Sequence, residues 1–473
     1  MARFVLLITG ICVSFAVSGQ KDISWDIKTG DKIARQVEKS IGLVTLPEAE
    51  KAIRSVGERL VSNLDSNPYT FTFQIVDQME PNAFALPGGH VYVSRGLVAL
   101  LKNEDELAGV LGHEIIHVTQ RHSAKQQNKA IVPSILAAPG VLLGSTLGGS
   151  VGDKVAAPLL GAGRIMMASY GRKQETEADE LGIALAARSG YDPNKLSDIL
   201  NRIERWVQSE TGKTAKFSLL NDHPVTPERE KNIAERSKAV EKTSIKPVYG
   251  ANEFLMAFNQ LPLGTNPSHG VFNENIFLHP TLNIYWELPK AWNYINESTV
   301  AGAASKDNQL MVTIAGKDRQ LDTLIENFVN GYYAKTRKQP ISDKRFDVNG
   351  RRGSEVILPR RENNQILYTM WFRKDHFTYV ILGVGSPDMQ DTFRSSTLTF
   401  RDLKEEDRDN IRMDEMVTLR ATGVETCALL AQKAGNQVNA GYLALVNNIP
   451  ETQTFVKGEI MKTIHRRKYT PKS

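Results

Sequence analysis

Apolar side chains recur at helical spacing in the N-terminal part of the chain. One stripe runs along residues 107–118 and consists of Leu107, Val110, Leu111, Ile115 and Val118. Positions three and four apart share one face of an α-helix, so this stripe predicts a helix with one buried face. Asn103 followed by Glu106 forms a capping box, which predicts that the helix begins there.

Short strand patterns surround this expected helix. Residues 30–62 carry apolar groups at helical spacing, whereas residues 71–76 alternate as a strand does. Residues 91–93 predict another short strand, and the Pro87-Gly88-Gly89 turn before it suits a tight bend. We expect residues 82–86 to form the edge of this small sheet.

The pattern changes beyond residue 250. A turn-rich stretch at residues 261–270 indicates a linker, and alternating strand patterns follow with one long helix at 321–329. Asn349-Gly350 is a strong hairpin signal. We therefore expect an α+β protein with a mainly helical domain at residues 20–250, a linker at 251–270, an antiparallel α+β domain at 271–405 and a small C-terminal domain at 410–473.

His113, Glu114 and His117 form an H-E-x-x-H motif on the expected helix. The two histidines lie one turn apart on the same face and can present two imidazole nitrogens to one metal ion. Glu114 points about 100° away from His113, close enough to hold a metal-bound water. The alternative is a pair of ordinary core or surface histidines. Because the chain has only nine histidines, we favour a zinc hydrolase.

A catalytic zinc site needs a third protein ligand, and the next histidine is a poor candidate for it. His122 follows His113 by nine residues, one short of the metzincin spacing, and Gln120 stands where that pattern has glycine. On a continuous helix His122 also turns away from the face of the other two histidines. We expect a surface or packing residue.

A later acidic segment offers better candidates. Glu175 and Asp179 are spaced to share one face of a helix, while Glu177 points elsewhere. Glu175 can ligate zinc, and Asp179 can accept a ring N–H from a liganding histidine and so fix its tautomer. Alone, such residues usually just place negative charge at the positive end of a helix dipole. After an H-E-x-x-H motif, we favour the metal-site interpretation.

These motifs together resemble a known family. HEIIH is followed by E-x-x-A-D-x-x-G at residues 175–182, and the flanking matches are residues 82–96 and His223-Pro224 with Arg229. Over this part the chain resembles the zinc metallopeptidase family of the CAAX prenyl endopeptidases and HtpX, in the soluble branch that includes the periplasmic β-barrel-assembly-enhancing peptidase. The resemblance implies a zincin-type domain, one Zn2+ per chain bound by His113, His117 and Glu175, and Glu114 as general base.

The resemblance also implies how protein or peptide substrates bind. It makes the sheet edge a substrate platform, formed by Asn82, Ala83, Phe84 and Ala85. An extended peptide can add to such an edge through main-chain hydrogen bonds, which places its scissile carbonyl over the zinc. The alternative is an ordinary strand pair in a sheet.

Two further residues come from the downstream match. Three protein ligands leave one open position on zinc, and His223 either fills it and holds the enzyme latent or donates a hydrogen bond to the developing oxyanion. The alternative is that His223 only caps a loop. Arg229 is expected to contact the ligand side chains without binding the metal itself.

The N-terminus predicts export. A short positive region, an apolar run from residue 4 to 17 and small residues after it indicate a signal peptide over residues 1–19 that is cleaved, so we expect a periplasmic or secreted protein. Cleavage leaves Cys427 as the only cysteine, which excludes an intramolecular disulfide. The net charge of +5 is spread out, without the basic patches of a nucleic-acid binder.

Two segments suggest further partners. Residues 130–168 are rich in Ala, Gly and Leu but interrupted by prolines, which indicates a loop over the cleft, with a peripheral membrane contact as the alternative. Residues 417–464 loosely resemble a LysM module, which implies peptidoglycan contact, but we favour a structural cap for this segment.

The sequence thus predicts an exported zinc endopeptidase in envelope protein quality control. The competing hypothesis is a chaperone-like or glycan-binding envelope protein with a latent peptidase site. A general protein substrate, cleaved by the metal-loaded protein and not after chelation, separates the two.

Overall fold

The computed structural model describes most of the chain, namely residues 23–125, 134–135, 165–166, 170–211, 223, 227–297, 300–360, 364–433, 435 and 440–470. The expected signal peptide at residues 1–19 lies outside these residues. Within 130–168 only the paired strands β4 (Ser134–Ile135) and β5 (Ile165–Met166) are described. Both predictions therefore stay predictions. Among the described helices, none is long and apolar enough to cross a membrane.

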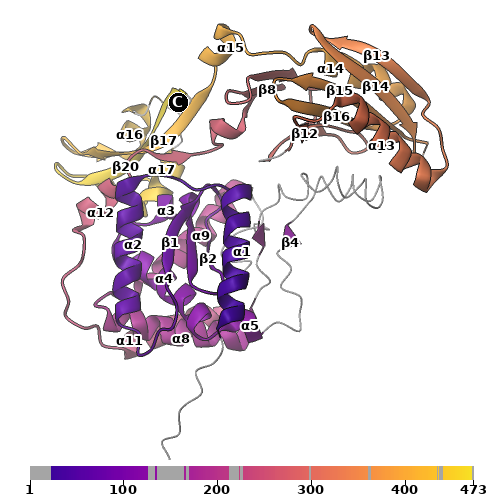
Figure 1. Ribbon diagram of the computed structural model, residues 1–473. Coiled ribbons are helices and arrows are strands. Elements are labelled where there is room, and N and C mark those ends of the chain that lie inside the picture. The colour runs from indigo at the N-terminus through magenta and orange to yellow at the C-terminus, as the bar shows by residue number, and fades with distance from the viewer. Residues whose placement is uncertain are drawn as a thin grey trace, which may run out of the picture.

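The N-terminal part is mainly helical and contains one small sheet (Figure 1). Its helices are α1 (Ser24–Ser40), α2 (Pro47–Ser62), α3 (Arg95–Leu100), α4 (Glu104–Thr119), α5 (His122–Lys125), α8 (Arg172–Arg188), α9 (Lys195–Thr211), α11 (Pro227–Ala239) and α12 (Ala251–Ala257). Helix α4 is buried almost throughout and packs against α2, α8 and α9. The sequence predicts one buried face for this helix, whereas the structure packs other elements against several of its faces.

Two glycines bring α4 and α8 close together. A Cβ atom on Gly182 would lie 2.9 Å from the backbone nitrogen of His113, and one on Gly112 would lie 3.1 Å from the carbonyl oxygen of Gly182. Only glycine leaves room for this approach. The glycine at the end of the E-x-x-A-D-x-x-G motif thus holds the two candidate ligand helices at contact distance.

The start of α4 follows the predicted cap only in part. The Asn103 side chain accepts a hydrogen bond from the backbone nitrogen of Glu106, as a capping residue does. The Glu106 carboxylate does not return to Asn103. Instead it accepts from the Lys102 backbone nitrogen and binds the Arg202 guanidinium through both oxygens.

The small sheet has the strand order β1-β3-β2, with β1 (Thr72–Val76), β2 (Ala83–Ala85) and β3 (His90–Ser94). Strand β3 runs parallel to β1 and antiparallel to β2. Gly88 and Gly89 in the turn between β2 and β3 have φ of +87° and +108°, which glycine adopts without strain. As predicted, β2 is an edge strand, and its side chains are buried.

The second part is built on a seven-stranded antiparallel sheet in the order β10-β11-β12-β16-β15-β14-β13. Its strands are β10 (Asn293–Glu297), β11 (Val300–Ala304), β12 (Gln309–Lys317), β13 (Ser342–Val348), β14 (Arg351–Pro359), β15 (Ile366–Lys374) and β16 (Phe377–Gly385). Helix α13 (Leu321–Thr336) covers one face. The other face packs on α14 (Gln390–Leu398) and on the small sheet of β7 (Val271–Asn273), β8 (Ile276–His279) and β9 (Ile284–Glu287).

Alternation along β15 explains the two cores of this domain. Tyr368, Met370 and Phe372 belong to the core beneath α14, whereas Leu367 and Trp371 belong to the core beneath α13. Successive side chains of a strand point to opposite faces, so a strand covered on both sides is apolar throughout. The predicted Asn349-Gly350 hairpin turn joins β13 to β14 with both residues at positive φ.

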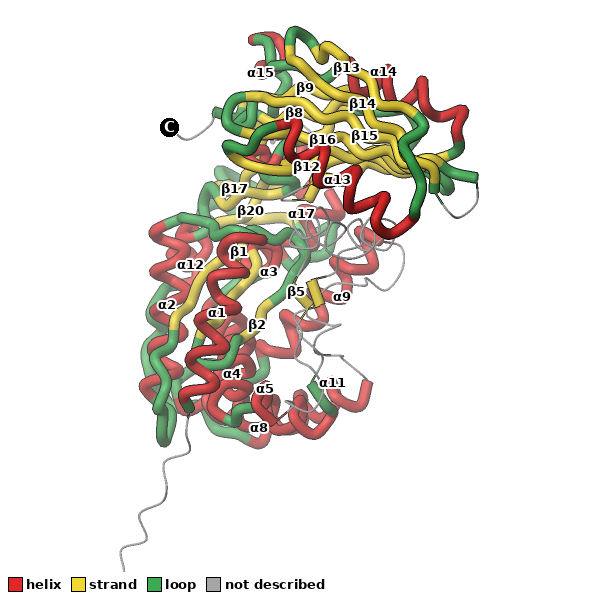
Figure 2. The backbone as a smooth tube through the Cα atoms, turned by 45° about the vertical axis from the view of Figure 1, so that its right-hand side comes forward, coloured by secondary structure: helices red, strands yellow, loops and turns green. Residues whose placement is uncertain are grey.

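The expected linker at residues 251–270 is not a free connection, and that prediction is wrong. Residues 251–257 form α12, and β6 (Leu261–Leu263) joins a three-stranded sheet in the order β20-β17-β6. The other two strands are β17 (Arg412–Arg420) and β20 (Ile460–Lys468). The chain therefore leaves the helical part through β6, forms the seven-stranded domain and returns in β17. Strand β17 pairs with β6 and lies between the helical part and the seven-stranded domain (Figure 2).

The C-terminal part shares its core with the helical part. Besides β17 and β20 it contains α16 (Cys427–Lys433) and α17 (Ala440–Asn447). Met416, Val446 and Ile464 lie in one hydrophobic cluster with the side chains of α4 and α12. On β20, the buried Lys462 ammonium donates to the carbonyl oxygens of Ala99 at 2.6 Å and Leu101 at 2.8 Å. The C-terminal part therefore packs against the segment that leads into the N-terminus of α4.

Candidate metal centre

Four side chains converge where α4 meets α8. His113 and His117 come from α4, Glu175 from α8, and His223 from the segment before α11. Nε2 of His113 lies 2.9 Å from Nε2 of His117 and 3.1 Å from Nδ1 of His223, which lies 2.9 Å from Oε1 of Glu175. All four side chains are buried, and their nearest nitrogen and oxygen atoms lie within 4.8 Å of one another.

The spacing of these atoms fits a metal ion. Ligand atoms about 2.0–2.1 Å from a tetrahedral zinc ion lie about 3.4 Å apart. The contacts between neighbouring ligand atoms run from 2.9 Å to the 3.6 Å between His113 Nε2 and Glu175 Oε2, and no separation in the cluster exceeds 4.8 Å. Three imidazole nitrogens and one carboxylate are also a donor set that zinc accepts. Among the described residues this is the one group with such geometry.

His113 is held from behind by a carboxylate. Its Nδ1 lies 3.0 Å from Oδ1 of Asp179, so Nε2 faces the other ligands. Arg229 binds both oxygens of Asp179 at 2.8 Å and also contacts Glu175 at 3.1 Å. Burial alone raises the pKa of Asp179, but hydrogen bonds from Arg229 and His113 outweigh it and hold that pKa below its ordinary value. Both residues thus contact the ligand side chains, and their predicted supporting role stays a prediction.

His117 has a different support, which the sequence interpretation missed. Its Nδ1 lies 2.8 Å from Nδ1 of His122, whose Nε2 lies 3.2 Å from Oε2 of Glu177. His122 is fully buried, so of the two roles expected for it the packing role is the correct one. Glu177 points away from the metal ligands, as expected, but its carboxylate contacts His122. The error came from extending α4 as a continuous helix, whereas Arg121 has a left-handed backbone with φ of +53° and the helix ends at Thr119.

Glu114 lies beside the cluster without belonging to it. It is 1% exposed, and its Oε1 lies 3.4 Å from Nε2 of His223. Burial lowers the pKa of His223, but the Glu175 and Glu114 carboxylates outweigh this and raise it to about 9. For His117, burial and the neighbouring histidines lower the pKa well below its usual value. A neutral imidazole is the form that binds a metal.

The predicted substrate edge lies close to these ligands. Ala85 of β2 lines a small cavity together with His117 and Tyr170. Phe84 turns into the core and stacks on Tyr92, with ring centroids 5.1 Å apart. Ala83 is buried as well, and Asn82 pairs with Ser94 through its backbone nitrogen and carbonyl oxygen. Any contact of this strand with a peptide must therefore run chiefly through its backbone.

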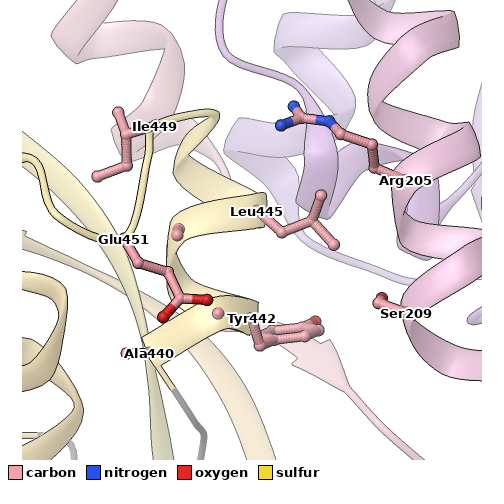
Figure 3. A pocket seen from close by; sticks show the side chains of 9 residues that line it. Arg205, Ser209, Ala440, Tyr442, Leu445, Ile449 and Glu451 are labelled. Atoms are coloured by element: carbon pink, nitrogen blue, oxygen red, sulfur yellow. The ribbon is translucent and has the colours of Figure 1, made fainter.

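A separate cavity of about 660 Å³ lies between α9 and α17 (Figure 3). Arg205 and Ser209 come from α9, and Tyr442 and Leu445 from α17, with Glu451 on the following loop. No metal-ligand group of the described residues falls in this cavity. We therefore assign the candidate chemistry to the cluster on α4 and α8 alone.

Comparison with known proteins points to the same region. Residues 47–237 match the model of Peptidase family M48. The Beta-barrel assembly-enhancing protease of Escherichia coli (strain K12) is 34% identical over 184 residues, which is 38% of this chain and 38% of that protein. The Mitochondrial metalloendopeptidase OMA1 of Schizosaccharomyces pombe is 29% identical over 39% of this chain and 51% of its own length.

A further relative is covered over more of its length. The Metalloprotease LoiP of Escherichia coli (strain K12) is 26% identical over 41% of this chain and 72% of its own length. In the first two relatives, by contrast, the match spans about half of the protein or less. The similarity therefore concerns the domain that holds the metal cluster.

Proposed function

We propose that this chain, whose residues 47–237 are a metallopeptidase domain of peptidase family M48, is a zinc-dependent endopeptidase that cleaves proteins of the cell envelope. The observation that carries the proposal is the convergence of His113, His117 and Glu175 in one buried cluster with Glu114 directly beside it. These are the ligand and base types that hydrolysis of a peptide bond at zinc requires.

The residues of the site have three separate roles, namely metal binding, proton transfer and orientation of the ligands. His113, His117 and Glu175 would hold the ion, which would supply a Lewis acid for the scissile carbonyl and for a water molecule. The Glu114 carboxylate takes a proton from the attacking water and returns a proton to the leaving amine nitrogen. Asp179 and Arg229 keep His113 and Glu175 in orientation through the contacts described above.

His223 fits the role of a latency device. Its Nδ1 lies among the ligand atoms, 3.1 Å from Nε2 of His113, and so occupies the position that an open catalytic site reserves for water. With His223 bound there, zinc would have no open position for the catalytic water, and the enzyme would be latent. Moved aside, the same imidazole can donate a hydrogen bond to the developing oxyanion.

The substrate backbone is proposed to pair with the free edge of β2. The strand is at the end of its sheet, and Ala85 lies against the cavity beside His117. An extended peptide added there reaches the cluster through main-chain hydrogen bonds, which suits an enzyme that acts on many sequences.

Action in envelope protein quality control rests on two supports. Residues 1–19 have the charge and apolar pattern that predicts a cleaved signal peptide, and one relative bears the name Beta-barrel assembly-enhancing protease. We place the protein in the periplasm or outside the cell on these grounds. Peptidoglycan contact through residues 410–473 and membrane contact through residues 130–168 remain predictions.

A direct test uses the purified chain and an unfolded general substrate such as casein. Cleavage that requires zinc, stops after chelation and returns when zinc is restored supports the proposal. A protein that binds zinc yet cleaves nothing, even after substitution of His223, contradicts it and favours a chaperone-like or glycan-binding protein with a latent site.

A further inference from the structure

Hydrogen-bond chemistry assigns the tautomer of each ring behind His117. The Glu177 carboxylate can only accept, so Nε2 of His122 must be the donor across their 3.2 Å contact. In a neutral imidazole the other nitrogen is then an acceptor. Nδ1 of His122 therefore accepts from Nδ1–H of His117 across 2.8 Å. This leaves the lone pair of His117 on Nε2, the atom that faces the ligand cluster.

A change of backbone direction after α4 places the His122 ring beside the His117 ring. Five positions apart on a helix, the two side chains would not face each other. Arg121 ends the helical path with a left-handed conformation, which is strained for a non-glycine residue. Its guanidinium is held at 2.8 Å by the buried Asp26, which also accepts from the Tyr69 hydroxyl at 3.2 Å.

Helix α8 and Tyr170, two residues before it, contact His117 and His122 from other sides. Gln174 donates its side-chain amide to the carbonyl oxygen of His122 at 3.1 Å. The Tyr170 ring stacks on His117 with centroids 3.9 Å apart, and its hydroxyl lies 3.0 Å from Oγ of Ser123. The ring plane of His117 is thus restrained by one contact and its tautomer by another.

We propose that His122 and Glu177 are positioning residues that fix the tautomer and direction of His117 for metal binding. The inference rests on the proposed metal site and matches, for the second histidine ligand, what Asp179 does for the first. The two ligands differ in kind, because His113 is backed by a carboxylate directly and His117 through an intervening imidazole. A metal-ligating histidine usually needs such a partner for its outer nitrogen.

The test measures zinc affinity by competition with a chromophoric chelator, so that cleavage is not the readout. His122→Phe removes the acceptor while keeping an aromatic ring, and we expect zinc affinity to fall about 10–100-fold. The electronic absorption of the cobalt-substituted protein should also change. His122→Asn places an amide oxygen near the former Nδ1 and should restore most of the affinity.

A substitution at Glu177 tests the same contacts without changing a buried side chain. Glu177→Ala removes the acceptor for Nε2–H of His122 at a side chain that is 41% exposed, and a smaller loss of affinity is expected. The matched control is Glu180→Gln on the same helix, whose carboxylate pairs with Arg236 and should leave zinc binding unchanged. Unfolding of the metal-free variants distinguishes positioning from stability, because a positioning role leaves that transition in place for Glu177→Ala.

Three outcomes overturn the inference. Wild-type zinc affinity and cobalt spectrum in both His122→Phe and Glu177→Ala show that the contacts have no such role. A loss in His122→Asn as large as in His122→Phe excludes the tautomer mechanism. A wild-type protein that binds no zinc removes the inference together with the proposed function. If the wild type binds zinc and the variants lose it, the inference holds even where no peptide is cleaved, and only the peptidase proposal fails.

Discussion

Nδ1 of His113 lies 3.0 Å from Oδ1 of Asp179, and this contact joins the two helices that carry the metal cluster. The carboxylate is held in turn by Arg229, which binds both of its oxygens. A histidine ligand whose outer N–H is fixed in this way has its lone pair directed at the metal before the metal arrives. The preorganisation of the site is therefore built into the interface between α4 and α8.

Removal of this partner should weaken the site without removing a ligand. For Asp179→Ala we expect zinc affinity or activity to fall about 10–100-fold, since His113 loses its orientation and Arg229 loses its main acceptor. Metal titration with a competing chelator measures the change. Asp198→Ala, on α9 and paired with Lys195, is the control. Wild-type values for Asp179→Ala would remove it from the site.

Substitution of His223 tests latency. Three protein ligands remain in His223→Ala, so zinc should be retained while basal proteolysis or self-cleavage rises. Casein cleavage and zinc content of the same preparation give the answer. A lower kcat with zinc retained assigns His223 to the oxyanion instead. Unchanged activity and unchanged zinc affinity contradict both roles.

The buried Arg202–Glu106 pair supports the start of α4 and should be costly to break. Arg202 is 0% exposed and binds both oxygens of Glu106 at 2.8 Å, as well as the carbonyl oxygen of Leu100. Arg202→Met leaves the buried carboxylate without its cation, which typically costs about 3–5 kcal/mol. Thermal unfolding of the metal-free protein should show a large loss, whereas the exposed Arg205→Met on the same helix should show little. Similar melting temperatures for both variants would contradict this account.

A carboxylate on the short helix α15 (Glu405–Asp409), between the seven-stranded domain and β17, predicts a pH-dependent stability. Burial raises the pKa of Asp407, but its ion pair with Arg401 and a hydrogen bond from the Lys404 backbone outweigh this and lower it. Because the folded pKa lies below the unfolded value, the stabilisation is full at neutral pH and is lost as pH falls below about 4.

Asp407→Asn should therefore lower the free energy of unfolding by about 1 kcal/mol at neutral pH. The difference from wild type should shrink in urea titrations carried out below about pH 4. Glu405→Gln, exposed on the same short helix, serves as the control. An equal difference at both pH values would show that the charge of Asp407 is not responsible.

Features governed by local spacing could be predicted from the sequence. The helix through His113 and His117, the edge position of residues 82–86 and the Asn349-Gly350 turn follow from periodicity and turn chemistry, and the structure has all three. Glu175 and Asp179 were placed together for the same reason. The pairing of these two helices needed more, namely the resemblance to a family.

Features that depend on contacts distant in sequence, or on a strained residue, were missed. Residues 261–263 have turn-forming neighbours and look like a linker, yet they pair with β17 far along the chain. The left-handed Arg121 carries no glycine or proline signal, so the sequence predicts a continuous helix through it and turns His122 away from the metal ligands. The Asp26 contact that accommodates this conformation comes from α1, and no local pattern reveals it.

The most direct test of the account compares Glu114→Gln with His113→Ala for bound zinc and for casein cleavage. Glu114 lies beside the ligand cluster and outside it, so Glu114→Gln should bind zinc as the wild type does and lose nearly all cleavage. His113→Ala should lose zinc and activity together. Equal loss of zinc in both variants, or full cleavage by Glu114→Gln, would contradict the assignment of Glu114 as the general base of a zinc endopeptidase.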